Sequence, residues 1–156
     1  MLQKPINFKV KLMLGIAMAG LAFSFSASAL EFRSVALPKV ISYDAPSKEA
    51  SKLFILSSGY PVEVIVNLGD WIKVRDQQGG LSWLESKSLS AKRTALVLTK
   101  TDIKATEDFT AALVATVEKD VVLELVAGAT KSGWQKVKHR DGVIGFVPVD
   151  KLWGVN

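Results

Sequence analysis

The chain has 156 residues, enough for one ordinary domain or two small ones. It contains no cysteine, so disulfides, thiolate nucleophiles and cysteine-based metal sites are excluded. Its 20 basic and 15 acidic residues give a net charge of +5, but three of the basic residues and none of the acidic ones fall within residues 1–29, which leaves +2 for the remainder. A charge this small does not indicate a nucleic-acid partner.

Residues 1–29 have the pattern of a secretory signal peptide. All three of their lysines lie in the first 11 residues, an uncharged run spans 12–25, and an Ala-Ser-Ala cleavage signature ends at Ala29. The run is too short for an ordinary membrane-spanning helix. We expect cleavage between Ala29 and Leu30, a periplasmic location, and no stable membrane insertion afterwards. A retained N-terminal anchor is the alternative.

Short strands separated by turns are predicted as far as Asn67. The apolar run that begins at Phe32 is stopped by Pro38. Further along, valines at 62, 64 and 66 recur with a period of two, which fits a half-buried strand. The candidate strands in this part are residues 32–37, 40–43, 53–56 and 62–67.

The stretch from Trp71 to Leu89 occurs a second time, from Trp134 to Leu152, without a gap. Each copy reads as a strand that opens with Trp, a polar turn ending in Gly, a second apolar strand, and a tight final turn closing on Leu. The matched positions are Trp71 and Trp134, Lys73 and Lys136, Val74 and Val137, Gly79 and Gly142, Trp83 and Phe146, and Leu89 and Leu152.

The second half repeats the order of the first. Candidate strands are residues 94–98, 111–117 and an alternating segment around Leu123. Five or six short strands per copy predict an all-β chain of two small tandem barrels, at residues 30–91 and 92–156. The joint at residues 91–93 has neither Pro nor Gly, so we expect the barrels to pack closely.

These residues give the chain a family resemblance. The pattern Trp-x-Lys-Val, a Gly turn, a small residue before an aromatic, and a closing Leu resembles the bacterial SH3-like domain. The stretch YPVEVIVNLGDWIKVRDQQGGLSWLESKSLSAKRTALV and the terminal KLWGV are similar to an exported proteobacterial SH3-like family of unknown specificity. The resemblance covers essentially all of the chain after residue 29. It implies tandem SH3-like barrels outside the cytoplasm and brings no catalytic residues.

Strand alternation groups aromatic and cationic side chains on one face of each repeat. If Val74 and Val137 face the cores, both matched Trp rings lie outward or at a strand end, where they could stack on a peptide or sugar. The alternative is that each ring caps a barrel end or packs between the copies. Because large aromatic side chains are usually buried, Trp83 and Phe146 are expected to fill the cores of their barrels. The candidate binding residues are Trp71, Lys73, Arg75, Trp134, Lys136 and Lys138.

The residues that build a polyproline groove are incomplete. Gly145–Leu152 is similar to the Gly-x-x-Pro-x-Asn-Tyr stretch of such grooves, but Lys151 stands in place of the Tyr. In the first copy, Glu85 and Ser88 replace the Pro and the Tyr. Because a rigid polyproline ligand needs an aromatic platform, PxxP binding is disfavoured.

No catalytic constellation is present in the sequence. His139 is the only histidine and lies in a basic turn, and neither a Gly-x-Ser-x-Gly elbow nor a phosphate-binding loop occurs. We therefore expect no enzyme activity, cofactor or metal. The leading hypothesis is a periplasmic binding module for cell-wall peptide or glycan, or for a wall-associated protein. A structural or inhibitory protein–protein adaptor is the alternative, and a hydrolase ranks a distant third.

Trp153 is expected to pin the C-terminal tail to a barrel or to the other copy.

Overall fold

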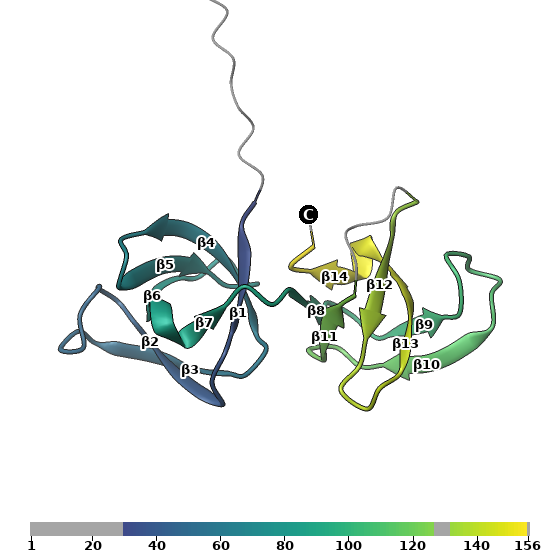
Figure 1. Cartoon of the computed structure of the whole chain (residues 1–156), viewed down its shortest axis with the longest axis horizontal. Coiled ribbons are helices and arrows are strands. Elements are labelled where there is room, and N and C mark those ends of the chain that lie inside the picture. Colours follow the sequence, from purple (N-terminus) through teal and green to yellow (C-terminus); the bar gives the residue numbers. More distant parts are fainter. Residues whose placement is uncertain (1–29, 127–131, 156) are drawn as a thin grey trace, which may run out of the picture.

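The computed structural model describes residues 30–126 and 132–155, so the signal peptide predicted at residues 1–29 lies outside the described residues. The described chain forms two antiparallel sheets of seven strands, one after the other in sequence (Figure 1). Each sheet curls into a small barrel, and the short segment between β7 and β8 joins the two. The prediction of an all-β chain with two tandem barrels is confirmed.

The first barrel contains the N-terminal half of the described chain. Its sheet order is β3-β2-β6-β5-β4-β1-β7. Its elements are β1 (Phe32–Val35), β2 (Lys39–Tyr43), β3 (Lys52–Ser57), β4 (Pro61–Asn67), β5 (Trp71–Arg75), β6 (Leu81–Glu85), the 3-10 turn η1 (Ser86–Ser88) and β7 (Leu89–Ser90).

The second barrel has the same topology, with sheet order β10-β9-β13-β12-β11-β8-β14. Its elements are β8 (Thr94–Val97), β9 (Thr101–Lys104), β10 (Leu113–Val117), β11 (Val122–Leu125), β12 (Trp134–Lys138), β13 (Ile144–Pro148), the 3-10 turn η2 (Val149–Lys151) and β14 (Leu152–Trp153). From β5 and β12 onward, the bounds of the two barrels match residue for residue along the repeat. The strand count differs from the prediction, because β9 and the two-residue strands β7 and β14 were not expected.

Alternation along the strands builds each core. Ile72 and Val74 of β5 are buried, and Leu84 of β6 packs with them. In the second barrel, Val137 and Leu123 are fully buried in the equivalent cluster. These side chains lie on one face of their strands because successive residues point to opposite sides of a sheet.

One strand departs from simple alternation. Val62 is buried and Val66 is 39% exposed, although both belong to β4 and have the same parity. A register shift against β5 lies between Val64 and Val66, and such a bulge turns the following side chains to the other face. The sequence pattern at residues 62–67 therefore predicted the strand correctly but not the position of its third valine.

Aromatic side chains hold the two barrels together. The ring of Trp153, in β14 of the second barrel, lies edge-on to Phe32 of β1, with centroids 5.2 Å apart. The same ring lies 6.5 Å from that of Tyr60, just before β4. Burial raises the pKa of Tyr60 above its ordinary value. The expectation that Trp153 pins the tail is confirmed, and the body it contacts is the first barrel.

Hydrogen bonds add to this interface. The Thr94 hydroxyl donates to the Gly59 carbonyl at 2.7 Å, across the two barrels. Arg93 lies over the Phe32 ring and donates to the Gly154 carbonyl at 2.8 Å. Gly154 has a φ of 104°, and a Cβ there would lie 2.8 Å from the Thr94 carbonyl oxygen, so only glycine fits. The expectation of closely packed barrels is confirmed.

Candidate functional site

A groove of about 490 Å³ lies on the first barrel. It is bounded by the loop of residues 44–51 between β2 and β3, by the start of β5, and by η1. The size is within the range of small-ligand sites. Its lining residues are Pro46, Ser47, Lys48, Glu49, Asp70, Trp71, Glu85, Ser86 and Lys87.

Trp71 is the aromatic side chain that lines this groove. It is half-buried, because it is the first residue of β5 and its face points away from the core residue Ile72. The Tyr43 ring meets it edge-on, with centroids 5.5 Å apart and planes at 88°. This T-shaped contact fixes the indole from one side. The part of the ring that lines the groove remains available to a ligand.

Backbone and side-chain hydrogen bonds fold the 44–51 loop onto itself. Asp44 and Ser51 close its base, with the Asp44 amide donating to the Ser51 carbonyl at 3.1 Å and the Ser51 amide donating to the Asp44 carboxylate at 3.0 Å. At the tip, the Ser47 hydroxyl donates to the Glu49 carboxylate. That hydrogen bond lowers the pKa of Glu49, so this groove residue is ionised at neutral pH. The loop forms one shaped wall of the groove.

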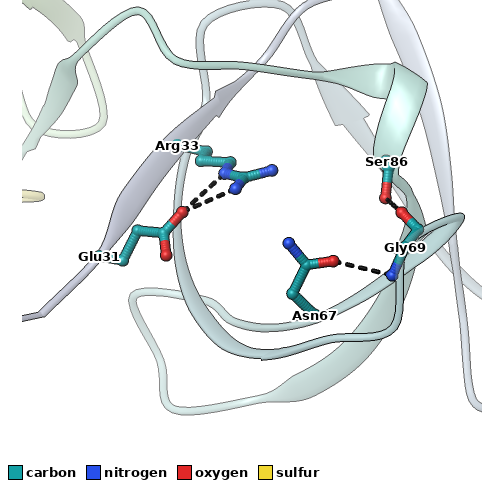
Figure 2. Close-up of polar contacts among 5 residues, drawn as sticks. All are labelled: Glu31, Arg33, Asn67, Gly69 and Ser86. Carbon is teal, nitrogen blue, oxygen red and sulfur yellow. Dashed lines mark hydrogen bonds and ion pairs between the residues drawn. The ribbon is translucent and has the colours of Figure 1, made fainter.

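Hydrogen bonds at the turn between β4 and β5 fix the opposite wall of the groove (Figure 2). The Gly69 amide donates to the Asn67 side chain at 2.9 Å, and the Ser86 hydroxyl donates to the Gly69 carbonyl. The Ser86 amide also donates to the Asp70 carbonyl at 2.8 Å. Gly69 has a φ of 86°, which favours glycine at the turn. These bonds fix η1 beside the turn that leads into Trp71.

Charged side chains connect the two walls across the groove. Glu85 accepts an ion pair from Lys87 at 2.9 Å and another from Lys48, on the 44–51 loop, at 3.5 Å. The hydrogen bond from Lys87 lowers the pKa of Glu85, against the opposing effect of burial, and Lys48 lowers it further. The groove therefore presents cations and anions beside one aromatic ring. Such a surface suits a ligand that itself carries both charges and an extended or flat apolar part.

The equivalent place on the second barrel is covered. Trp134 is only 5% exposed, and the ring of Phe109 lies over it with centroids 4.7 Å apart. Phe109 belongs to the loop between β9 and β10, the counterpart of the 44–51 loop, and is itself 72% exposed. Of the two readings drawn from the sequence, the packed ring therefore fits Trp134, and the outward ring open to a ligand does not. Its ring is structural because a loop aromatic shields it.

The candidate cations of the first barrel are engaged within the barrel. Lys73 lies over the ring of Trp83, its partner across the β5–β6 ladder, at 5.9 Å. Arg75 makes a two-point ion pair with the buried Glu63, at 2.6 and 2.8 Å. Neither side chain lines the groove beside Trp71.

The cations of the second barrel also separate. Lys136 lies over Phe146 at 5.8 Å, repeating the first-barrel contact, whereas Lys138 lines a cleft between the barrels. Trp83 and Phe146 are half-buried and lie under these lysines, outside the two buried core clusters, so the expectation that they fill the cores is wrong. The candidate binding residues of each barrel thus share one face of a strand, but they do not line one continuous binding site.

Several groove residues were missed from the sequence. Lys48 comes from the 44–51 loop, and Lys87 lies in η1. Glu85 ends β6, where it is the ladder partner of Trp71. The repeat could have indicated the residues after the second apolar strand. Because this strand runs antiparallel to the strand that begins with Trp71, the turn at its end lies beside Trp71.

No group of three or more His, Asp or Glu side chains in residues 30–126 and 132–155 is placed to hold a metal ion. None of the helices in that part of the chain has the length and apolar character needed to cross a membrane.

The fold and the groove define a tandem module of small β-barrels, and comparison identifies its family. The model of the bacterial SH3 domain matches residues 38–91 and 108–154, more than half of the chain. The chain therefore belongs to the bacterial SH3 domain family. No curated protein matches it.

Some solved structures are similar at low identity. NlpC1 from Trichomonas vaginalis is 19% identical, with a TM-score of 0.38, over 83% of this chain and 47% of that one. An NlpC/P60 family protein from Bacillus cereus ATCC 10987 is 13% identical, with a TM-score of 0.36, over 78% of this chain and 55% of that one. The chain thus spans about half the length of these proteins. Similarity this low does not transfer an activity to it.

Proposed function

We propose that the protein is a non-catalytic binding module of the cell envelope, exported to the periplasm through the signal peptide at residues 1–29. Its first-barrel groove binds a short peptide of the cell wall, alone or attached to glycan. The observation that carries this proposal is the half-buried Trp71, which lines the same groove as the ion-paired side chains of Lys48, Glu85 and Lys87. Membership of the bacterial SH3 domain family supports a binding role.

The chemistry of the groove fits a peptide with free amino and carboxyl groups. A carboxylate can exchange into the contacts that Lys48 and Lys87 make with Glu85, and an amino group can approach Glu85 or Glu49. The indole face supplies flat contact area at little cost in conformational entropy. A stacking ring with one charged contact contributes on the order of 1–3 kcal/mol, so binding by one groove is weak.

The two barrels do not offer equal sites. Trp134 is covered by Phe109, whereas Trp71 lines an open groove. Tight retention on wall material therefore requires many copies of the ligand or a second contact surface, not two matched aromatic sites.

Sedimentation with purified cell-wall sacculi tests the proposal. We expect Trp71→Ala to abolish retention while the protein stays folded, with a thermal midpoint that decreases by only a few degrees because the half-buried ring loses its contact with Tyr43 but no core residue is removed. Trp134→Ala is the matched control and is expected to lower the midpoint, because its ring is buried. Retention that survives in the Trp71 variant would exclude the groove as the wall site. A collapse of its midpoint would make the ring structural.

Export has its own test. Mass spectrometry of the protein from the periplasmic fraction is expected to find Leu30 as the first residue. A protein that begins at Met1 would contradict the cleavage and with it the proposed location.

A structural or inhibitory adaptor is the second candidate, and the edge strand β3 favours it. Among the strands of residues 30–126 and 132–155, β3 pairs only with β2, and it forms one edge of the first sheet. Phe54 and Ile55 in this strand are 61% and 68% exposed. An exposed apolar edge strand is a surface on which a partner protein can add a strand. Cross-linking in the periplasm, with and without Ile55→Lys, distinguishes the two candidates, because a β3 partner is lost in this variant while wall binding remains.

A further inference from the structure

A second recess lies between the two barrels. It has a volume of about 560 Å³, and both barrels and the segment that joins them contribute to it. Its polar lining includes Ser58 before β4, Ser90 and Lys92 around the joint, Glu124 of β11, and the end of β12 with its following turn. The recess is separate from the Trp71 groove, with which it shares no residue.

The shape of this cleft is fixed by close contacts at its base. Gly59 has a φ of 82°, and a Cβ there would lie 3.3 Å from Val122 of the other barrel. Beside it, the Thr94 hydroxyl donates to the Gly59 carbonyl at 2.7 Å. Two barrels that meet this closely hold the cleft side chains in constant relation, so a ligand would meet a formed site and not have to assemble one.

Positive charge prevails in the cleft. Lys92 and Glu124 form an ion pair at 2.8 Å, which cancels their charges. Lys138 and Arg140 remain, and Lys138 makes no ion pair within the described residues. Arg140 has only a distant contact, 3.7 Å, with Asp141, and both of these side chains are largely exposed. Among the side chains that line the cleft, cations thus outnumber carboxylates by two, while Asp141 lies outside the lining and within ion-pair distance of Arg140.

Neutral donors accompany these cations. The Ser90 hydroxyl accepts the Lys92 amide at 3.0 Å, which leaves its own proton free to donate. The Ser58 hydroxyl lines the first-barrel side of the cleft. His139 lies between the two cations in sequence and contacts Asp141 through Nδ1 at 3.2 Å, so its ring is held by the turn. Hydroxyl, ammonium and guanidinium donors together are the usual partners of phosphate oxygens.

We propose that the inter-barrel cleft binds a phosphate ester, with Lys138 and Arg140 contacting the phosphate and the Ser58 and Ser90 hydroxyls completing its hydrogen bonds. A phosphomonoester carries close to two negative charges, which matches the two excess cations. A carboxylate offers one charge and two oxygens and would leave one cation without a counter-charge. The cleft is larger than a phosphate group alone, so it also has room for the glycerol or sugar that carries the phosphate.

Titration of the isotope-labelled protein with glycerol phosphate, followed by amide NMR, tests the proposal. We expect saturable shifts at Ser58, Gly59 and Lys138, and an affinity that decreases as salt is added. The double variant Lys138→Met/Arg140→Met should bind about a hundred-fold more weakly, which is about ten-fold per cation removed. The charge-matched control, Lys39→Met/Lys119→Met, removes two exposed lysines outside the cleft and should bind like the parent.

Three results would overturn the proposal. They are no saturable shift of the cleft amides, equal weakening in the two double variants, and succinate binding as tightly as glycerol phosphate. Vesicles that contain phosphatidic acid, whose headgroup is a phosphomonoester, distinguish the source of the phosphate. Co-sedimentation that the cleft variant loses indicates a lipid headgroup, and binding of the soluble ester alone indicates a free phosphate ester. None of these outcomes depends on the Trp71 groove, so failure here leaves the proposed function to its own test.

Discussion

Removal of the Trp153 ring is predicted to uncouple the two barrels. This indole is half-buried between Phe32 and Tyr60, and it is the aromatic side chain that the second barrel places against the first. In Trp153→Ala the two barrels keep their own cores, since neither buried cluster includes Trp153. What is lost is the apolar contact between them.

The size of the effect follows from the buried area. A Trp side chain buries 150–250 Å² when fully enclosed, so a half-buried ring buries about 100 Å², and its removal costs about 2.5 kcal/mol. The edge-on contact with Phe32 adds about 1 kcal/mol beyond area. A total of about 3.5 kcal/mol corresponds to a decrease of about 10 °C in thermal midpoint for a protein of this size.

Scanning calorimetry measures both the midpoint and the number of transitions. The parent is expected to unfold in one transition, and Trp153→Ala in two, at lower temperature. Trp83→Ala is the control, because Trp83 is also half-buried but lies on the outer face of the first barrel. A single transition at the parent's midpoint in the Trp153 variant would refute the reasoning, since the barrels would then be held together by other contacts.

Three further predictions concern single contacts. Arg75→Met should lower the midpoint of urea unfolding because it leaves the buried Glu63 carboxylate without its cation, and Arg75→Lys should lower that midpoint less. Equal decreases in the two variants would mean that the two-point geometry is unimportant. Phe109→Ala should expose the Trp134 ring and increase its fluorescence quenching by iodide, and unchanged quenching would show that another group covers it. The pKa of Glu85 is lowered by Lys87, so its ion pairs stabilise the protein above the ordinary value of 4.5 and are lost as pH falls below it. The parent's thermal midpoint should therefore decrease more between about pH 5 and pH 3 than that of Glu85→Gln, and parallel decreases would contradict this.

The sequence predicted the fold well because its main signal is local. The repeat that begins at Trp71 and Trp134 predicts two strands, the turn between them and the final turn in each barrel, and the alternation at Ile72 and Val74 identifies the core face. The bulge in β4 escaped prediction, because a register shift depends on the partner strand and leaves no mark on the valine pattern.

The candidate site was less predictable because it depends on contacts between distant segments. Two matched tryptophans have different surroundings, since Phe109 comes from a loop that the repeat does not include. Lys138 shares a strand face with Trp134, yet the way the barrels pack places it in a cleft with Lys92. Strand alternation predicts on which face of a strand a side chain lies. It does not predict which side chains of another loop or barrel pack against that face.

Binding of wall peptide in the first-barrel groove can be measured directly by amide NMR of the purified protein during titration with a soluble disaccharide-peptide fragment of the cell wall. We expect saturable shifts at residues 46–49, 70–71 and 85–87, and none of comparable size at residues 107–110 of the second barrel. Shifts confined to β3 or to the second barrel, or no shift for a fragment that the protein still retains on sacculi, would contradict this expectation.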